Sequence, residues 1–214
     1  MAYNTMRSED SRLEGIVNEF LDKYFLNTFD DVHWVKDKDT QVKGVDILLT
    51  SSTLGLHDAQ VDIKSAVKYS DRYLGTYSLE LSFIGRGYKE RTGWFINDEL
   101  DTEYYLLLYP RSQKHYTDIK TVDDIDYVDY YLVKKEDLKK FFISRGYDKE
   151  RFLDVCAEMR EELGDSNRKL TWDSDSENFH FSLTGYLAEK PINVVVKRQV
   201  YEKYATLKGR IEKI

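Results

Sequence analysis

The sequence predicts a fold of mixed helices and strands, α/β (α+β), in which helices flank a central mixed β-sheet. Three observations lead to this fold class. Apolar residues follow a helical repeat near the N-terminus, strict alternation of apolar and polar residues marks several short strands, and the stretch 102–109 is apolar almost throughout, as in a central strand. At 214 residues the chain is long enough to bury a sizeable core.

A first helix is expected from about residue 9 to residue 25, with Ser8 or Asp10 available as its N-cap. Glu14 falls at the edge of the apolar face of this helix. Two readings of Glu14 follow: an acidic group that reaches inward toward a site, or a rim carboxylate on a surface helix. The helical repeat alone does not choose between them.

The stretch 41–65 predicts a β-hairpin. Apolar residues alternate in both halves, at Val45, Ile47 and Leu49 and then at Val61 and Ile63. A turn about Leu54 and Gly55 pairs positions whose numbers sum to about 108. The sequence therefore predicts one continuous pair of strands in this stretch.

This pairing sets Asp46 opposite Asp62, and Lys64 follows on the same face of the hairpin. Carboxylate oxygens are suited to Mg²⁺ or Mn²⁺, and a nearby ammonium group can orient a water molecule or stabilise developing charge. The three residues therefore predict metal-dependent phosphodiester hydrolysis. The alternative is an exposed cross-strand ion pair of little energetic weight.

Acid-x-Lys triplets also occur at 118–120 and 137–139, in an acidic loop and in a predicted helix. The triplet 62–64 differs because a strand carrying Asp46 precedes it. The next strand, 76–83, has Glu80 on its polar face. If this strand is added beside the hairpin, Glu80 becomes a further metal ligand; otherwise it is an ordinary exposed carboxylate.

The loop 85–93 carries Arg86, Lys89 and Arg91 among glycines, a pattern that suits contact with a phosphate backbone and equally a solvated turn. Further strands are expected at 93–96, at 102–109 with Pro110 as its end, at 130–133, 170–172, 179–183 and 192–196, and helices at 134–144, 149–163 and 198–213. The acidic stretch after Pro110 is the expected seam between a core, residues 1–115, and a C-terminal α+β lobe, residues 116–214. A single domain over residues 1–214 is the alternative.

The net charge of −7 disfavours a broad basic face for gripping nucleic acid, but the charge is segregated. Residues 118–130 are acidic and would suit a basic protein partner, whereas residues 197–214 are mostly basic. The sequence has no apolar run long enough to cross a membrane and no apolar signal core, so a cytoplasmic protein is expected. The single cysteine, Cys156, excludes an internal disulfide and any zinc site that needs several cysteines.

The helix with Glu14, the words Gly44-Val45-Asp46 and Asp62-Ile63-Lys64, and the flanking words 76–81, 93–95 and 102–108 resemble the PD-(D/E)xK nuclease superfamily, in particular its small bacterial and phage members. The likeness covers roughly residues 10–110. It implies a restriction-endonuclease-like core. Val45 stands where that family has its named proline, a position that carries no chemistry.

By position, the resemblance implies Asp46 and Asp62 as ligands of Mg²⁺ or Mn²⁺, Lys64 as the group that activates water, and Glu14 as a helix-borne acidic partner. Gln41, three residues before Gly44, joins the loop basic residues as a candidate contact to nucleic acid. The expected function is a metal-dependent nuclease that acts on DNA. The alternative is an inactive nuclease-like protein that binds a partner, and either one is compatible with a homodimer.

Overall fold

The structure is a computed structural model that describes residues 2–213, with side chains described for Glu9 and from Ser11 onward. The chain folds into two compact units. Unit 1 consists of Met1–Leu74, Thr102–Lys134 and Ala205–Ile214, and unit 2 consists of Gly75–Asp101 and Lys135–Tyr204. This division differs from the expected boundary at residue 115, because the chain leaves unit 1 and returns to it twice.

Over the described residues, the strands form a six-stranded and a five-stranded sheet, which together with the helices confirms the mixed α+β class. The six-stranded sheet belongs to unit 1 and has the order β1-β2-β3-β6-β7-β11. Its strands β3 and β6 are parallel and its other neighbours are antiparallel, so the sheet is mixed, as expected. The strand bounds are β1 Asp31–Trp34, β2 Ile47–Ser51, β3 Leu56–Ser65, β6 Tyr104–Arg111, β7 Tyr127–Lys134 and β11 Ala205–Glu212.

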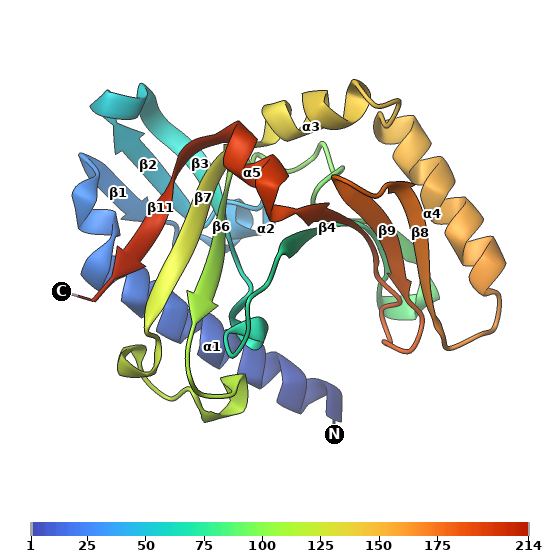
Figure 1. Cartoon of the computed structure of the whole chain (residues 1–214), viewed down its shortest axis with the longest axis horizontal. Coiled ribbons are helices and arrows are strands. Elements are labelled where there is room, and N and C mark those ends of the chain that lie inside the picture. The colour runs from blue at the N-terminus through green and yellow to red at the C-terminus, as the bar shows by residue number, and fades with distance from the viewer. Residues whose placement is uncertain (1, 214) are drawn as a thin grey trace. The chain divides into compact units, whose positions relative to one another are not determined.

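Helix α1 (Ala2–Tyr24) runs along one face of the six-stranded sheet (Figure 1). Its apolar side chains and those of the facing strands form one buried cluster, which includes Leu13, Val17, Phe20, Ile47, Leu49, Val61, Leu106 and Leu132. The expected amphipathic helix is thus confirmed, but it begins at Ala2. Ser8 and Asp10, the expected N-caps, therefore fall inside the helix, and their side chains lie outside the part that the structure describes.

Unit 2 is built on the five-stranded sheet, which has the order β5-β4-β10-β9-β8 and antiparallel neighbours throughout. The strands are β4 Thr76–Ile84, β5 Glu90–Thr92, β8 Lys169–Asp175, β9 Phe179–Thr184 and β10 Ile192–Lys197, and the helices are α3 Lys135–Ile143, α4 Lys149–Leu163 and α5 Arg198–Tyr204. Helices α3 and α4 match their predicted ranges closely, and Gly164 ends α4 as expected.

Aromatic rings hold the core of unit 2 together. The ring of Phe142, on α3, lies 5.6 Å from that of Phe95, 5.2 Å from that of Phe152 and 5.1 Å from that of Phe179, centroid to centroid. The tilted, edge-to-face arrangement of these pairs is the one that aromatic quadrupoles favour. Helices α3 and α4 are thereby tied to the inner face of the sheet.

Strand β4 does not lie beside the hairpin, which the sequence analysis considered as the way to bring Glu80 to the site. The alternation over 76–83 does form a strand, but this strand lies between β5 and β10 in unit 2 and is not added beside the hairpin. The neighbour of β3 is instead β6, in parallel register, with Asp62 beside Tyr105. A parallel pair requires a long crossover, and the segment that includes β4 provides it.

Three further expectations are wrong in detail. The C-terminal helix ends at Tyr204, and the following residues form β11, because its alternating Leu207 and Ile211 pack on the core of unit 1. Residues 94–96 form a turn, not a strand. Pro110 lies within β6, past Leu108, where pairing with β3 has ended and the missing N–H of proline costs least.

In the described part of the chain, no helix is both long enough and apolar enough to cross a membrane.

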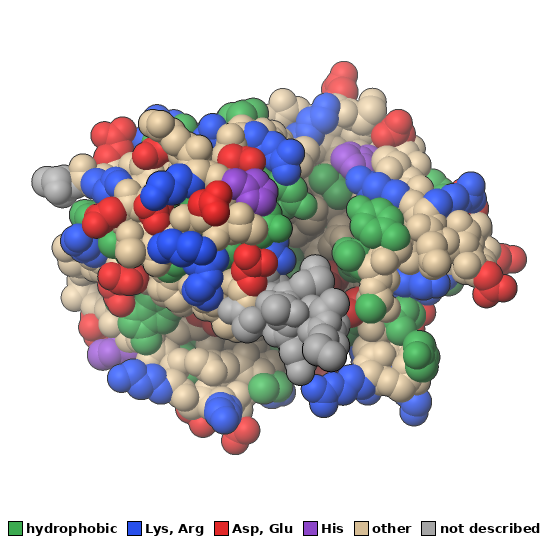
Figure 2. All heavy atoms as spheres, turned by 90° about the horizontal axis from the view of Figure 1, so that it is seen from below, with side chains coloured by type: hydrophobic (Ala, Val, Ile, Leu, Met, Phe, Trp, Pro, Cys, Tyr) green, Lys and Arg blue, Asp and Glu red, His purple; other side chains and the backbone are tan. Residues whose placement is uncertain are grey.

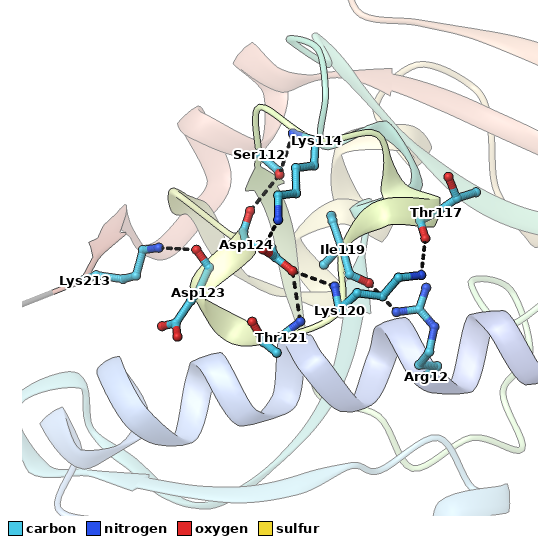
Figure 3. A network of polar contacts seen from close by, with 10 residues as sticks. All are labelled: Arg12, Ser112, Lys114, Thr117, Ile119, Lys120, Thr121, Asp123, Asp124 and Lys213. Atoms are coloured by element: carbon cyan, nitrogen blue, oxygen red, sulfur yellow. Dashed lines mark hydrogen bonds and ion pairs between the residues drawn. The ribbon is translucent and has the colours of Figure 1, made fainter.

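The acidic connection between β6 and β7 is organised by the carboxylate of Asp124 (Figure 3). It accepts hydrogen bonds from Lys114 Nζ at 2.5 Å, from the backbone N–H of Lys120 at 2.7 Å and from that of Thr121 at 3.1 Å. The hydrogen bond from Lys114 and the two backbone N–H groups lower the pKa of Asp124 to about 2. Part of the acidic character of residues 118–130 is therefore neutralised within the fold.

The same connection also accepts hydrogen bonds from α1, near the N-terminus, and from Lys213, near the C-terminus (Figure 3). The guanidinium group of Arg12, on α1, donates to the carbonyl oxygen of Ile119. Lys213 Nζ, near the C-terminus, donates to the carbonyl oxygen of Asp123 at 2.8 Å. These contacts hold the connection against α1 and beside the end of β11.

Replacing Asp124 with Ala is expected to lower the free energy of unfolding by about 1 kcal/mol, the usual cost of losing a capping carboxylate. Urea denaturation at pH 7 measures it, with Asp118→Ala as control because Asp118 is an exposed carboxylate in the same connection. Because the pKa of Asp124 is lowered, its contribution is present above pH 4 and is lost as the pH falls toward 2. Equal stability of the two variants at pH 7 would contradict the assigned role.

Candidate metal-dependent active site

The hairpin β2–β3 has the register that the alternation predicts. Ile47 faces Val61 and Leu49 faces Ala59, so the paired numbers sum to 108. The turn closes with Gly55 in the left-handed region at φ +66°, which glycine adopts without strain. Within the paired strands the register shifts beyond Leu49, close to the turn, and at the other end the pairing begins with Ile47 and Val61.

Asp46 directly precedes β2 and is fixed to β3 by two hydrogen bonds. Its backbone N–H donates to the carbonyl oxygen of Val61 at 2.9 Å, one residue out of the register of the paired strands. Its side-chain Oδ2 accepts from the backbone N–H of Ile63 at 2.7 Å. Asp46 is therefore anchored to β3 on both sides of Asp62, and its carboxylate lies close enough to that of Asp62 to affect its pKa.

Asp62 is paired with Lys64 two residues further along β3, with 2.8 Å between Lys64 Nζ and Asp62 Oδ1. Only 4% of the Asp62 side chain is exposed, against 28% of Lys64. Among the acidic side chains that the structure describes, Asp62 is the only one in the buried class. The pair is thus no surface ion pair, because its negative partner lies away from water while its positive partner reaches solvent.

Burial dominates the electrostatics of this carboxylate. Removal from water raises the pKa of Asp62 to about 7, against the lowering effect of Lys64, and the neighbouring carboxylate of Asp46 raises it further. Burial, with the nearby charge of Asp62, also raises the pKa of Tyr105 well above its usual value. Burial therefore outweighs the attraction of Lys64 and disfavours the ionised form of Asp62.

Asp62 and Lys64 lie on one face of the six-stranded sheet. Val61 and Ile63 pack with the cluster under α1, and side chains alternate along a strand, so Asp62 and Lys64 point to the opposite face. The carboxylate of Asp46, just before β2, lies close enough to Asp62 to raise its pKa. The convergence that the hairpin pattern predicts is thereby found in the structure.

Glu14 is not brought to this group. Its side chain is exposed on α1, and α1 packs on the other face of the sheet. Among the described residues, no three acidic, histidine or cysteine side chains gather closely enough to hold a metal ion together. The helical repeat placed Glu14 correctly at the edge of the apolar face, but it could not tell which face of the sheet the helix covers.

The reason for considering Glu80 as a metal ligand does not hold in the structure. The prediction required its strand to lie beside the hairpin, whereas β4 belongs to the sheet of unit 2, where Glu80 faces Asn193 of β10. The site described here is consequently formed by Asp46, Asp62 and Lys64 without it.

The expected contacts to nucleic acid are all exposed. Gln41 lies on the short helix α2 (Lys38–Val42) of unit 1 and donates through Nε2 to the carbonyl oxygen of Val35 at 2.8 Å. Arg86, Lys89 and Arg91 lie in unit 2, around the turn that joins β4 to β5. Gln41 therefore shares a unit with the acidic pair, and the three basic residues belong to the other unit.

Sequence reasoning missed the segment that follows Lys64 directly. After β3, a short 3-10 helix (Val67–Tyr69) is fastened to the sheet, since Ala66 N–H donates to Leu108 O and Ser112 N–H to Ser70 O, both at 2.9 Å. On this anchored segment Tyr69 and Tyr73 are 47% and 72% exposed. The two exposed tyrosines interleaved with Lys68 and Arg72 were a signal that the sequence already contained.

The carboxylate pair has the donor chemistry that Mg²⁺ or Mn²⁺ requires. Asp46 accepts a backbone hydrogen bond through Oδ2, Asp62 pairs with Lys64 through Oδ1, and the two carboxylates interact with each other, so both lie where one cation could bind them. Mg²⁺ is usually held by one or two carboxylates together with water and substrate phosphates, so two are sufficient. The raised pKa of Asp62 shows that added positive charge here would be stabilising. The residues present therefore fit a divalent metal.

Comparison with protein-family models, curated proteins and solved structures found no match to this chain.

The raised pKa of Asp62 predicts how stability depends on pH when a chelator is present. The unfolded chain releases this proton near pH 4 and the folded chain near pH 7, so the stabilising contribution is present below pH 4 and is lost as the pH rises to 7. Between pH 5 and pH 7, the stability of the wild type should fall relative to that of Asp62→Asn by on the order of 1 kcal/mol or more.

Urea denaturation at several pH values measures this difference. Asp118→Asn is the matched control, since it removes an exposed carboxylate of the same unit. A constant stability difference between the wild type and Asp62→Asn across this range would show that Asp62 titrates as an ordinary carboxylate.

Proposed function

We propose that this chain is a metal-dependent nuclease that hydrolyses phosphodiester bonds in DNA, with unit 1 as a restriction-endonuclease-like core. The observation that carries the proposal is the group formed by Asp46, Asp62 and Lys64: two facing carboxylates with an ammonium group 2.8 Å from the buried one. Neither a structural ion pair nor a solvated strand face accounts for a carboxylate buried beside a second carboxylate.

Asp46 and Asp62 would together hold Mg²⁺ or Mn²⁺ through their carboxylate oxygens. When bound, such an ion shields the phosphodiester charge and lowers the pKa of a coordinated water. Lys64 has its Nζ fixed by Asp62 and is 28% exposed, so it can donate to a water or to a phosphate oxygen that arrives from solvent. The N–H of Ile63 keeps Asp46 in the orientation that this role needs.

A nucleic acid is the substrate class that the neighbouring segment favours. Tyr69 and Tyr73 offer exposed rings for stacking on bases, and the guanidinium of Arg72 lies over the Tyr69 ring at 5.3 Å. Aromatic rings combined with cations are the usual means of binding unpaired nucleotides. The segment starts directly after Lys64 and is anchored to β6, so its rings stay close to the proposed site of hydrolysis.

The surface charge suits a local grip on the substrate. On the face seen in Figure 2, Lys and Arg side chains are interspersed with Asp and Glu side chains, without one continuous basic field. With a net charge of −7, binding would depend on few phosphate contacts and on the bound metal. Weak binding in the absence of divalent ions follows.

The alternative function is a nuclease-like protein that binds a partner without cutting nucleic acid. One observation favours it: Lys64 is paired with the buried Asp62 at 2.8 Å, so its ammonium group already serves to compensate that charge within the fold. The acidic residues 118–130 would then be the surface for a basic protein. The two functions differ in whether cleavage requires Lys64.

Replacing Lys64 with Ala is expected to lower DNA cleavage by about 100-fold or more, because the group that orients water or stabilises developing charge is lost. The assay uses single- and double-stranded DNA and RNA with Mg²⁺ or Mn²⁺. Lys23→Ala, on the helix that covers the opposite face of the sheet, is the control and should leave the rate unchanged. Cleavage at the same rate in Lys64→Ala and the wild type would sink the nuclease proposal.

Binding of Mn²⁺, measured by calorimetry near pH 8, tests the ligands independently of cleavage. Asp46→Asn and Asp62→Asn should each weaken it by about tenfold or more, since removing one charged oxygen donor costs at least as much as one strong polar contact. Asp118→Asn, which removes an exposed carboxylate in the connection between β6 and β7, should not change it. Metal binding that survives in both site variants would place the ion elsewhere and favour the binding protein.

A further inference from the structure

Unit 2 contains a cavity of about 300 Å³ whose lining comes from that unit alone. Its residues lie on α3, at the start of α4 and in the turn after β5. The volume is at the lower end of the range for small-molecule sites. None of its lining residues belongs to the group formed by Asp46, Asp62 and Lys64, so the cavity needs its own explanation.

The wall of the cavity is aromatic and rigid. Phe95 and Phe152 are 0% and 3% exposed, and their ring centroids are 6.1 Å apart in an edge-to-face arrangement. The ring of Tyr147 stacks on that of Phe152 at 5.9 Å with an angle of 29° between the planes. Ile143, also part of the wall, is 57% exposed and marks the opening to solvent. Such a wall favours a planar aromatic ligand.

The rim of the cavity is charged. The carboxylate of Asp98 lies between two ammonium groups, with Oδ1 3.0 Å from Lys139 Nζ and Oδ2 2.6 Å from Lys149 Nζ. Lys139 and Lys149 remain 27% and 48% exposed, so a second anion can reach both from solvent. Asp148, the other acidic residue of the lining, is engaged as the N-cap of α4 and accepts from the Arg151 N–H at 2.8 Å.

We propose that this cavity binds a small planar aromatic anion, with its ring against Ile143 and Tyr147, above the buried Phe95 and Phe152, and its carboxylate shared between Lys139 and Lys149. Asp98 already demonstrates that a carboxylate is accommodated between these two lysines. Because the Asp98 carboxylate pairs with both lysines, it also competes with the ligand for them. This inference does not rest on the nuclease function, because both the site and its test are independent of metal and of nucleic acid.

Because Asp98 competes with the ligand for the two lysines, replacing Asp98 should change the affinity of an anionic ligand and of a cationic ligand in opposite directions. Removal of the Asp98 charge releases Lys149 and leaves Lys139 paired with Glu136 alone, at 3.4 Å, so Asp98→Asn should tighten an anionic ligand, whereas it would weaken a cationic one. Lys149→Gln should do the opposite. Lys140→Gln is the matched control, because Lys140 lies on the same helix as Lys139, is 74% exposed and pairs with Asp137 away from the cavity.

The experiment is a ligand-observed NMR titration of the full chain with 2-naphthoate and with its neutral analogue 2-naphthamide, without divalent metal. The wild type should bind naphthoate with a Kd of about 1 mM or tighter, and more tightly than the amide. Asp98→Asn should lower the Kd for naphthoate about 2- to 5-fold and Lys149→Gln should raise it by a similar factor, as expected for partly exposed charge pairs. Lys140→Gln should leave it unchanged.

Four outcomes would overturn the proposal: no binding to the wild type, equal affinity for naphthoate and naphthamide, weaker naphthoate binding in Asp98→Asn, or an effect of Lys140→Gln as large as that of Lys149→Gln. Far-ultraviolet circular dichroism and thermal unfolding confirm that each variant is folded. All three substituted side chains are exposed, and replacing them leaves the aromatic wall intact.

Discussion

The burial of the Asp62 carboxylate is the constraint on which the account of this protein depends. A carboxylate that is 4% exposed must be compensated, and the fold supplies one ammonium group, from Lys64, while it sets Asp46 alongside. The balance leaves the pKa of Asp62 at about 7, so the folded protein carries a site that is more stable when it gains a proton or a cation. Burying one carboxylate beside another destabilises the fold, so a functional role is the simplest explanation of this arrangement.

The hairpin register and the long crossover keep this group in place. Backbone pairing of β2 with β3 fixes Asp46 against Asp62, and the parallel partner β6 places Tyr105 beside Asp62 and covers it. The connection from β3 to β6 passes through unit 2, and a second excursion lies between β7 and β11. Three separate segments of the chain therefore build unit 1, and the site lies on strands near the middle of its sheet.

The local features of the site could be predicted from the sequence, and the long-range ones could not. Alternation and a Gly55 turn determine which residues face each other in a hairpin, so Asp46, Asp62 and Lys64 were found together. Alternation does not specify the neighbouring strand, and so it left open whether β4, with Glu80, lies beside the hairpin; the structure places it in the other sheet. Residues 205–212 were expected to be helical because their pairing with β7 is a tertiary contact. The aromatic cavity of unit 2 brings α3 and α4 together with the turn after β5, and no single stretch of sequence contains it.

The central claim is that Asp46 and Asp62 together bind a catalytic divalent metal. Its most direct test is a crystal structure of the protein soaked in Mn²⁺, with the anomalous signal recorded. The account predicts one strong peak within coordination distance of a carboxylate oxygen of both Asp46 and Asp62, with Lys64 Nζ close by, and no such peak in crystals of Asp62→Asn. A wild-type crystal that binds Mn²⁺ only at other residues, or that shows no peak between the two carboxylates, would contradict it.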